Sequence, residues 1–503
     1  MHNFISKRPF FFIIFILYAV FPVPPDAQEF FSPHRQAIEQ HRHDPVLPDL
    51  LDSDNMAPMP LALSKAPYQE NVVFGYLPWW IEKEYYENID FDLLTHISAF
   101  SAEVNPDGSI AEDHGWPWTG LINRAHASGV RVVLTMTLFG DTNVLTLLEN
   151  SVSRERFFRE VHDRLRVSNA DGVNIDFEGP GTNGWPSLIN EFMADLTTYL
   201  HNEFPGCEVS FAAPPVDWGQ RWDYVGLAKS CDYLFIMGYA FSGSWSERTG
   251  PTAPLTGGSR NISTTLSGDF GAVTRTTPEK LILGVPYYGC QWHTDIPDPR
   301  ASTIEFIRHP RIATTFADLP DRDRLWDEIS STPWYRYKDG QKWMQVWYDD
   351  AQSIALKYNL AAEHRLKGVG MWALGYEGQR RELWDLLQEL FGRRPHTTWV
   401  TSTQQPVSFD VAPNYPNPFN GVTSIKYALP STGLLEISIY DISGQLLQFW
   451  RQDQMSPGTY QWNWDGRNRR GVSVGSGMYF CSMRFASLKG DEQLRTQRML
   501  LLR

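Results

Sequence analysis

Between about residues 71 and 391 the chain alternates short apolar runs with longer amphipathic stretches. The apolar runs are near-continuous and rich in branched side chains, as expected for strands that are covered on both faces. Several intervening stretches, such as residues 154–167 and 185–202, have helical periodicity. The pattern predicts eight strands, which begin near Val72, Thr95, Arg131, Gly172, Val209, Tyr233, Leu281 and Gly368.

Eight strands with helical crossovers predict an α/β fold, a (β/α)8 barrel with insertions, over residues 71–393. The alternative is an open, doubly wound sheet. No glycine-rich phosphate loop follows the first predicted strand, so the barrel is the favoured interpretation.

The pattern changes on either side of this domain. Residues 28–70 are rich in Pro, His and Asp without sustained periodicity, which predicts a mostly irregular leader with a short helix near residues 35–41. A polar linker covers residues 394–411. Short alternating strands separated by turn clusters then predict a small all-β sandwich over residues 412–503.

The first 27 residues have the layout of a secretory signal peptide: Lys7 and Arg8, a short apolar run, then small residues near Ala27. An uncleaved membrane anchor is the alternative, but the run is short for a bilayer span. We therefore expect an exported protein that has no membrane span after cleavage of the signal peptide.

The four cysteines fit no metal-binding spacing. Cys207 and Cys231 each precede a predicted strand, so a disulfide between them is plausible in an exported protein. Cys290 and Cys481 are expected to be buried free thiols.

The net charge of -14 disfavours nucleic acid as a partner, because its phosphates would be repelled. Many of the 19 tryptophans are expected in the core, but some could stack on a ligand with flat apolar faces, such as a sugar ring.

The stretch "DGVNIDFE" at residues 171–178 places acids in a strand. Because strand side chains alternate, Asn174, Asp176 and Glu178 share one face, and the apolar side chains between them share the other. The apolar face suits the helix side of a barrel. The polar face then points inwards, with Glu178 at the carboxyl end, where barrel enzymes keep their active sites.

Two acids at adjacent positions of one face repel each other, so one retains its proton to higher pH. A protonated glutamic acid is the species needed as a general acid for a departing glycosidic oxygen. The alternative is a structural cluster that binds a basic residue or an ion. No basic residue lies in the strand. We expect no metal and no cofactor.

The octapeptide resembles the Asp-x-x-Asp-x-Asp-x-Glu signature of glycoside hydrolase family 18, the chitinase-like barrel family. Three further stretches, in the expected order, resemble its sixth, seventh and eighth strands: "IMGYAF", "LGVPYYG" and "GVGMWALGYE". The resemblance covers about residues 71–391.

The resemblance implies roles for individual residues. Glu178 matches the general acid/base, Asp176 the acid that steadies the acetamido group of the substrate, and Tyr239 the hydroxyl that holds the oxygen of that group. Trp372 matches the aromatic floor under the sugar, and Met237 belongs to the Met-x-Tyr motif. Members of the family use the N-acetyl oxygen of the substrate as the nucleophile and retain the anomeric configuration, an exception to the two-carboxylate scheme.

Two positions depart from the family pattern. Asn174 replaces the middle Asp of the signature; its amide can hydrogen-bond Asp176 but cannot share charge with it. Ala240 replaces the Asp that follows the sixth-strand Tyr, which removes a polar contact near the cleavage point.

Aromatic residues near strand ends could form a stacking track for a sugar chain, although each could equally pack in the core. They are Tyr76, Trp79, Trp80, Trp218, Trp245 and Trp292. Asn174, Trp372, Met237, Tyr76 and Trp292 are the expected substrate-binding residues.

The C-terminal stretches "NYPNPFNGVTSIKYALP" and "GVSVGSGMYF" resemble the sorting domain of the type IX secretion system and the related Ig-like domain of the flagellar hook-capping protein. The resemblance implies export or surface attachment through the secretion machinery. A passive sandwich or a carbohydrate-binding appendage is the alternative.

The sequence therefore predicts a secreted or surface-attached bacterial hydrolase that cleaves β-1,4 bonds next to N-acetylglucosamine in chitin fragments, peptidoglycan or glycans. The alternative is a chitinase-like lectin with little or no activity. The partner in either case is an N-acetylglucosamine-containing glycan.

Overall fold

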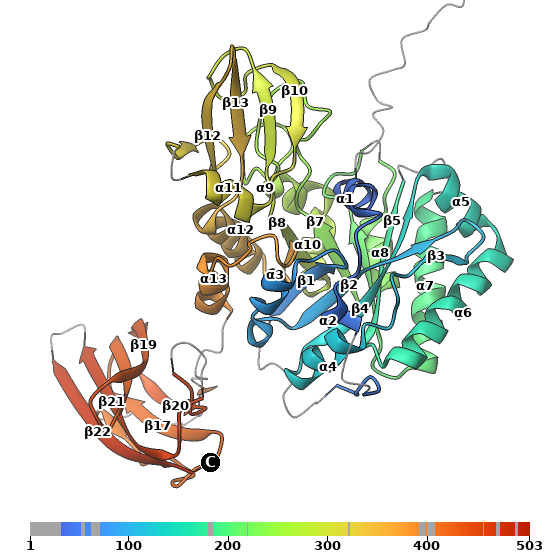
Figure 1. Cartoon of the computed structure of the whole chain (residues 1–503). Helices are drawn as coiled ribbons and strands as arrows, with labels where there is room; N and C mark the ends of the chain where they lie inside the picture. The colour runs from blue at the N-terminus through green and yellow to red at the C-terminus, as the bar shows by residue number, and fades with distance from the viewer. Residues whose placement is uncertain are drawn as a thin grey trace, which may run out of the picture. The chain divides into compact units, whose positions relative to one another are not determined.

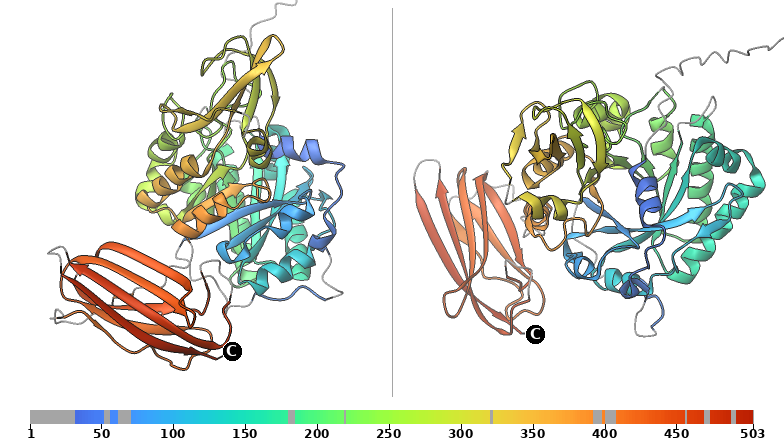
Figure 2. Two further views of the ribbon diagram at one scale, coloured as in Figure 1. Left: turned by 60° about the vertical axis from the view of Figure 1, so that its left-hand side comes forward. Right: turned by 45° about the horizontal axis from the view of Figure 1, so that its top comes forward.

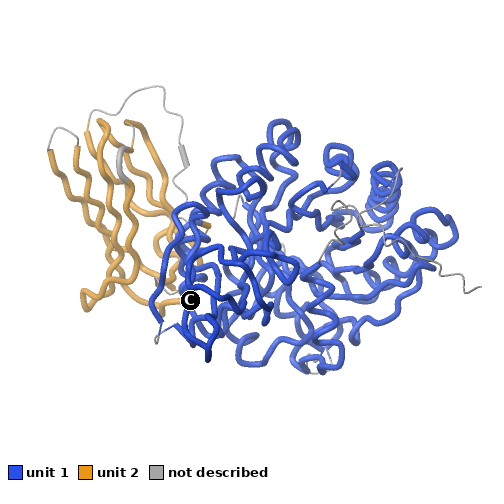
Figure 3. The backbone as a smooth tube through the Cα atoms, turned by 90° about the horizontal axis from the view of Figure 1, so that it is seen from above, with its two compact units in different colours: residues 1–390 blue, residues 391–503 orange. Residues whose placement is uncertain are grey.

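In the computed structural model, the chain forms two compact units, residues 1–390 and residues 391–503 (Figure 3). Each unit is considered by itself. The structure describes residues 32–51, 56–61, 71–179, 185–218, 220–319, 322–391, 398–399, 408–455, 457–468, 473–487 and 491–502.

The first unit contains a closed parallel barrel (Figure 1). The strands pair in the order β1-β14-β8-β7-β6-β5-β4-β2, and β1 pairs with β2 to close the ring. This confirms the predicted (β/α)8 barrel and all eight predicted strands. Their bounds are β1 Val72–Pro78, β2 His96–Val104, β4 Arg131–Phe139, β5 Gly172–Glu178, β6 Glu208–Ala213, β7 Tyr233–Met237, β8 Leu281–Pro286 and β14 Gly368–Trp372.

The helices between successive strands lie outside the ring (Figure 2). They bury one apolar stripe each, as expected for helices that cover a parallel sheet. The main ones are α4 Thr119–Ala127, α5 Asp141–Glu149, α6 Ser151–Ser168, α7 Trp185–Glu203, α8 Tyr224–Ser230, α10 Gly271–Thr276, α12 Ala351–Glu363 and α13 Glu382–Leu390.

A five-stranded antiparallel sheet is inserted after β8, the seventh strand of the barrel. Because β8 ends at the mouth of the barrel, the insertion begins there, and Figure 1 shows it on the same side as α1. Its strands pair in the order β10-β9-β13-β12-β11. They are β9 Cys290–Thr294, β10 Thr303–Arg308, β11 Leu325–Asp327, β12 Thr332–Asp339 and β13 Lys342–Trp347.

The described part of the leader contains one helix more than the sequence predicts. It forms α1 (Pro33–His41), the helix expected near residues 35–41, and a short second helix, α2 (Pro48–Leu51). Local chemistry starts α1: Pro33 lies at the first helical position, and the Ser32 side chain accepts a hydrogen bond from the backbone N–H of Arg35. Helix α1 lies over the carboxyl ends of the barrel strands (Figures 1 and 2).

The second unit is a β-sandwich made of two four-stranded sheets, in the orders β15-β20-β17-β16 and β19-β18-β21-β22. Side chains of both sheets, including Ile425, Trp462, Ile437 and Met483, form one buried cluster. The strands are β15 Thr398–Trp399, β16 Asp410–Val411, β17 Thr423–Leu429, β18 Gly433–Asp441, β19 Leu446–Met455, β20 Gly458–Trp464, β21 Gly477–Ser487 and β22 Glu492–Leu501.

All four cysteines are buried free thiols. The disulfide considered for Cys207 and Cys231 is not formed, because the two side chains turn to different partners. The Cys231 thiol donates to the carbonyl of Leu227 in α8 at 3.2 Å, and Cys207 lies against the carbonyl of Glu208 at 3.9 Å.

The predicted signal peptide lies outside the described residues. Among the residues that the structure describes, no helix has both the length and the apolar character that a membrane crossing requires.

Gly172 sets how closely β5 approaches β6. A Cβ at this position would lie 2.0 Å from the backbone carbonyl oxygen of Glu208. We expect Gly172→Ala to lower the free energy of unfolding by about 3 kcal/mol or more, because neither backbone can yield without breaking the ladder. Chemical denaturation measures the effect. Gly268→Ala is the matched control: a Cβ there meets nothing within 4 Å. Equal losses in both variants would contradict the explanation.

Candidate active site

The polar face of β5 points into the barrel. Asn174 and Asp176 are fully buried, and Glu178, the last residue of the strand, is 5 % exposed. β5 pairs in parallel with β4, where Thr137 is opposite Asp176 and Phe139 is opposite Glu178. The two carboxyls therefore lie one above the other at the carboxyl end of the fourth barrel strand.

Beneath them, Asn174 is held by the neighbouring strand β6 and by β1, which does not pair with β5. Its Oδ1 accepts a hydrogen bond from the hydroxyl of Tyr76 in β1 at 2.8 Å, and its Nδ2 donates to Ser210 Oγ in β6 at 2.9 Å. The expected hydrogen bond from Asn174 to Asp176 is replaced by these two. Asn174 and Tyr76, both expected to bind substrate, thus form a support below the carboxyls.

Tyr239, Met237 and Trp372 come from the sixth and eighth barrel strands. Met237 ends β7, and Tyr239 follows it with a fully buried side chain. Burial raises the pKa of Tyr239 well above its usual value, so its hydroxyl remains a donor. Trp372 ends β14 and is 1 % exposed.

Two residues of the leader enter this site. His34 Nδ1 lies 2.7 Å from Asp176 Oδ2, and His34 Nε2 lies 2.9 Å from the Tyr239 hydroxyl. The ring centroids of His34 and Trp372 are 3.9 Å apart. The hydroxyl of Ser32 donates to Glu178 Oε1 at 2.6 Å. Sequence reasoning missed both leader residues, since the leader has no motif that marks them.

Burial raises the pKa of Asp176 to about 8. It also raises the pKa of Glu178 to about 8, with the nearby charge of Asp176 adding to the shift. Two buried carboxyls this close to each other cannot both be ionised, so at least one of them carries a proton near neutral pH. Burial lowers the pKa of His34 to about 4, so its imidazole is neutral near pH 7.

Within the described residues, His34, Asp176 and Glu178 could each offer one ligand atom to a metal, and these atoms lie within 4.8 Å of one another. Ligands of a tetrahedral zinc ion are about 3.3 Å apart, given metal–ligand bonds of about 2.0 Å. The 2.7 Å between His34 Nδ1 and Asp176 Oδ2 is shorter than that. This spacing is that of a direct hydrogen bond.

The predicted aromatic track is not assembled as a set. Trp292 is fully buried in the core of the inserted sheet, packed with Trp334 and Trp347, and its expected substrate contact is not supported. Trp79 is also buried and stacks on His114 at 3.5 Å. Trp218 is 54 % exposed.

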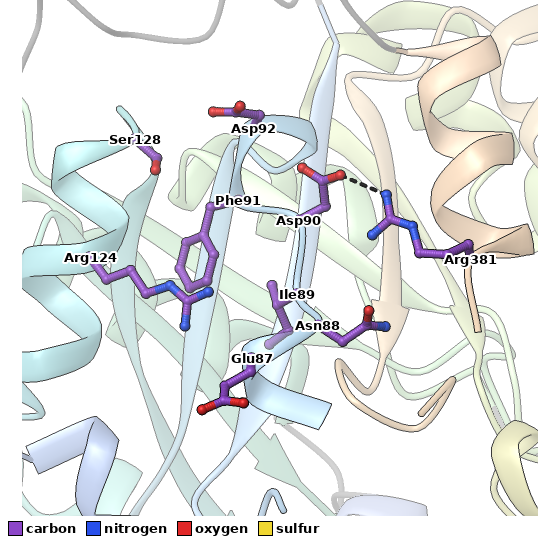
Figure 4. A pocket seen from close by; sticks show the side chains of 9 residues that line it. All are labelled: Glu87, Asn88, Ile89, Asp90, Phe91, Asp92, Arg124, Ser128 and Arg381. Atoms are coloured by element: carbon purple, nitrogen blue, oxygen red, sulfur yellow. Dashed lines mark hydrogen bonds and ion pairs between the residues drawn. The ribbon is translucent and has the colours of Figure 1, made fainter. Parts of the chain in front are cut away.

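A separate surface pocket lies just before the amino end of β2 (Figure 4). Arg124 covers the ring of Phe91, with its guanidinium 4.4 Å from the ring centroid, and Arg381 pairs with Asp90 at 2.9 Å. The predicted catalytic residues lie at the opposite, carboxyl end of the barrel strands.

A closed parallel barrel whose fourth strand ends in a carboxyl with a raised pKa can supply a general acid at its mouth. The chain belongs to the glycosyl hydrolases family 18, whose family model matches residues 72–377. The predicted family and enzyme class are thereby confirmed.

Relatives from animals and from bacteria share this domain. Over 306 residues the chain is 29% identical to human di-N-acetylchitobiase, an alignment that covers 53% of this chain and 75% of the relative. It is 25% identical to the cortical fragment-lytic enzyme of Bacillus subtilis over 313 residues, covering 59% and 68%. The crystal structure of a Cycas revoluta GH18 chitinase with (GlcNAc)3 has the same fold, with a TM-score of 0.57 and 21% identity, covering 63% of this chain and 99% of that one.

Residues 414–494 match the secretion system C-terminal sorting domain. This match confirms the predicted sorting module and assigns the chain to export and attachment at the cell surface.

The buried carboxyl of Glu178 makes stability depend on pH. Its pKa rises from 4.5 to about 8 on folding, so between these values the folded state binds more protons and becomes less stable as pH rises. Glutamine does not titrate, so Glu178→Gln removes this loss of stability at higher pH. We expect the variant to gain stability over the wild type as pH rises from 5 to 8, by at most about 1.4 kcal/mol per pH unit. Denaturation at a series of pH values measures the difference; a difference independent of pH would contradict the assignment.

Proposed function

We propose that the protein hydrolyses β-1,4 bonds next to N-acetylglucosamine by a retaining mechanism in which the substrate assists. One observation carries the proposal: Asp176, Glu178 and Tyr239 converge on one buried space at the mouth of the barrel, where the same leader residues contact all three. Chitin oligosaccharides, peptidoglycan and glycans all contain such bonds.

In this mechanism Glu178 is the general acid that protonates the departing oxygen and then the base that activates water. Its raised pKa supports the first role, because the group keeps its proton near neutral pH. The raised pKa of Asp176 supports the second, since Asp176 can hold a proton while Glu178 is ionised.

The acetamido group of the substrate would bind between Asp176 and Tyr239. Asp176 accepts from its N–H, which increases the electron density on its carbonyl oxygen, and the Tyr239 hydroxyl orients that oxygen for attack on the anomeric carbon. Trp372 would lie under the sugar ring, as an aromatic floor on which the apolar face of the sugar stacks.

A sugar-binding role without hydrolysis is the second candidate, and Ala240 favours it. Ala240 follows Tyr239 where the family motif has an acid, and its backbone is left-handed (φ 61). A methyl group there offers no hydrogen bond to the reacting sugar.

Glu178→Gln separates the two candidates. We expect the variant to release fluorophore from chitobioside and chitotrioside substrates about 10²–10⁴-fold more slowly than the wild type, because glutamine cannot transfer a proton. Binding of unlabelled chitotriose, measured by calorimetry, should change little, since the amide keeps the shape of the acid.

Glu377→Gln is the matched control. Glu377 is another fully buried glutamate with a pKa raised by burial, to about 7, and its Oε1 accepts from Trp384 Nε1. Its replacement by glutamine should leave the rate of turnover within about 3-fold of the wild-type rate. The His34→Ala variant, which lacks the leader contacts, is measured beside the wild type. If both proteins bind oligosaccharide but hydrolyse neither these substrates nor peptidoglycan, the sugar-binding role is correct instead.

A further inference from the structure

The leader occupies the space in front of the proposed reacting groups of the site. Ser32 and His34 contact Glu178, Asp176 and Tyr239, and the imidazole lies against Trp372. His34 is fully buried, as is Asp176. While α1 is in place, no sugar ring can reach these groups.

The imidazole of His34 matches an acetamido group in shape and in hydrogen bonding. An acetamido group is flat, with one N–H donor and one carbonyl acceptor. A neutral imidazole is also flat, with one donor nitrogen and one acceptor nitrogen. With the hydrogen on Nδ1, the ring donates to Asp176 and accepts from Tyr239. These are the two bonds proposed above for the substrate.

Ser32 occupies a second position in the site, next to the proposed general acid. Its hydroxyl is within 2.6 Å of Glu178 Oε1, at the acid that would protonate the glycosidic oxygen. The same Oγ accepts from the backbone N–H of Arg35 at 2.9 Å, so the first turn of α1 holds the hydroxyl in place.

The rest of the leader is attached to the barrel. His41 stacks on Trp80 with ring centroids 4.6 Å apart and an interplanar angle of 6°. The backbone N–H of Leu47 donates to the carbonyl of Trp79 at 3.2 Å, and Leu50 is fully buried. These contacts hold α1 at a high effective concentration over the mouth.

We propose that residues 32–41 are an intramolecular competitive inhibitor of the enzyme, with His34 in the place of the acetamido group of the substrate and Ser32 on the general acid. This inference rests on the proposed function for the identity of the substrate. Substrate and leader exclude each other, so hydrolysis requires that the leader leaves the site.

The inference predicts a specific kinetic change. An inhibitor that competes with substrate raises the apparent KM and leaves kcat unchanged. In the full-length chain, we expect His34→Ala to lower KM for the chitotrioside substrate at least about tenfold, because it removes two hydrogen bonds to the site. The kcat of this variant should stay within about 3-fold of the wild-type value. Ser32→Ala should act in the same direction with a smaller effect.

Arg35→Ala is the matched control. Arg35 is exposed on the same helix and pairs only with Glu39 at 3.0 Å among the ion pairs of the described residues, so its kinetics should equal those of the wild type. An unchanged or higher KM in His34→Ala overturns the inference. A kcat that falls about tenfold or more overturns it too, because His34 would then take part in catalysis.

Calorimetry separates this inference from the proposed function. Chitotriose is titrated into Glu178→Gln and into the double variant with His34→Ala. At least about tenfold tighter binding in the double variant, together with no turnover in any variant, supports the inference and refutes the hydrolase. Turnover that does not depend on His34 refutes the inference alone. Absence of both binding and turnover throughout refutes both.

Discussion

The burial of Asp176 and Glu178 on one face of β5 is the constraint on which the site depends. Two carboxylates out of water, one above the other, cannot both be ionised, so burial raises both pKa values and one proton remains on the pair. That proton is the one that the proposed acid catalysis would use. The surrounding barrel shields the pair from water. Tyr76 and Ser210 form hydrogen bonds with the side chain of Asn174 below it, and Gly172 lets β6 approach β5 closely.

The leader supplies one hydrogen-bonding partner to each carboxyl of the pair. Buried carboxyl oxygens need donors, and in this structure Ser32 and His34 provide them. The cost of burying His34 is limited because the imidazole is neutral, its pKa being lowered by the same burial that raises those of the acids. The acetamido group of a substrate would offer Asp176 a donor and Trp372 a flat surface in place of His34. Stability and access to the site are therefore opposed in this molecule.

The two departures from the family motif have different structural consequences. An aspartate at position 174 would add a third carboxyl to the buried row, whereas the neutral Asn174 is hydrogen-bonded to both β1 and β6. Ala240 has no such compensation among the described contacts. It lies at the mouth, next to Tyr239, in a left-handed conformation that aspartate adopts more readily than alanine.

Local patterns in the sequence determined the barrel and the reactive row. Branched apolar runs specify covered strands, and the two-residue period of a strand places Asn174, Asp176 and Glu178 on one face, whatever lies far away in the chain. Tertiary structure decided what meets that face. His34 is 142 residues from Asp176 and 205 from Tyr239, and an aperiodic leader carries no signal of where it docks. The same holds for Trp292, a candidate sugar contact by type, which the inserted sheet encloses in its own core. Burial and long-range pairing depend on how separate elements pack, and no period along the chain records that.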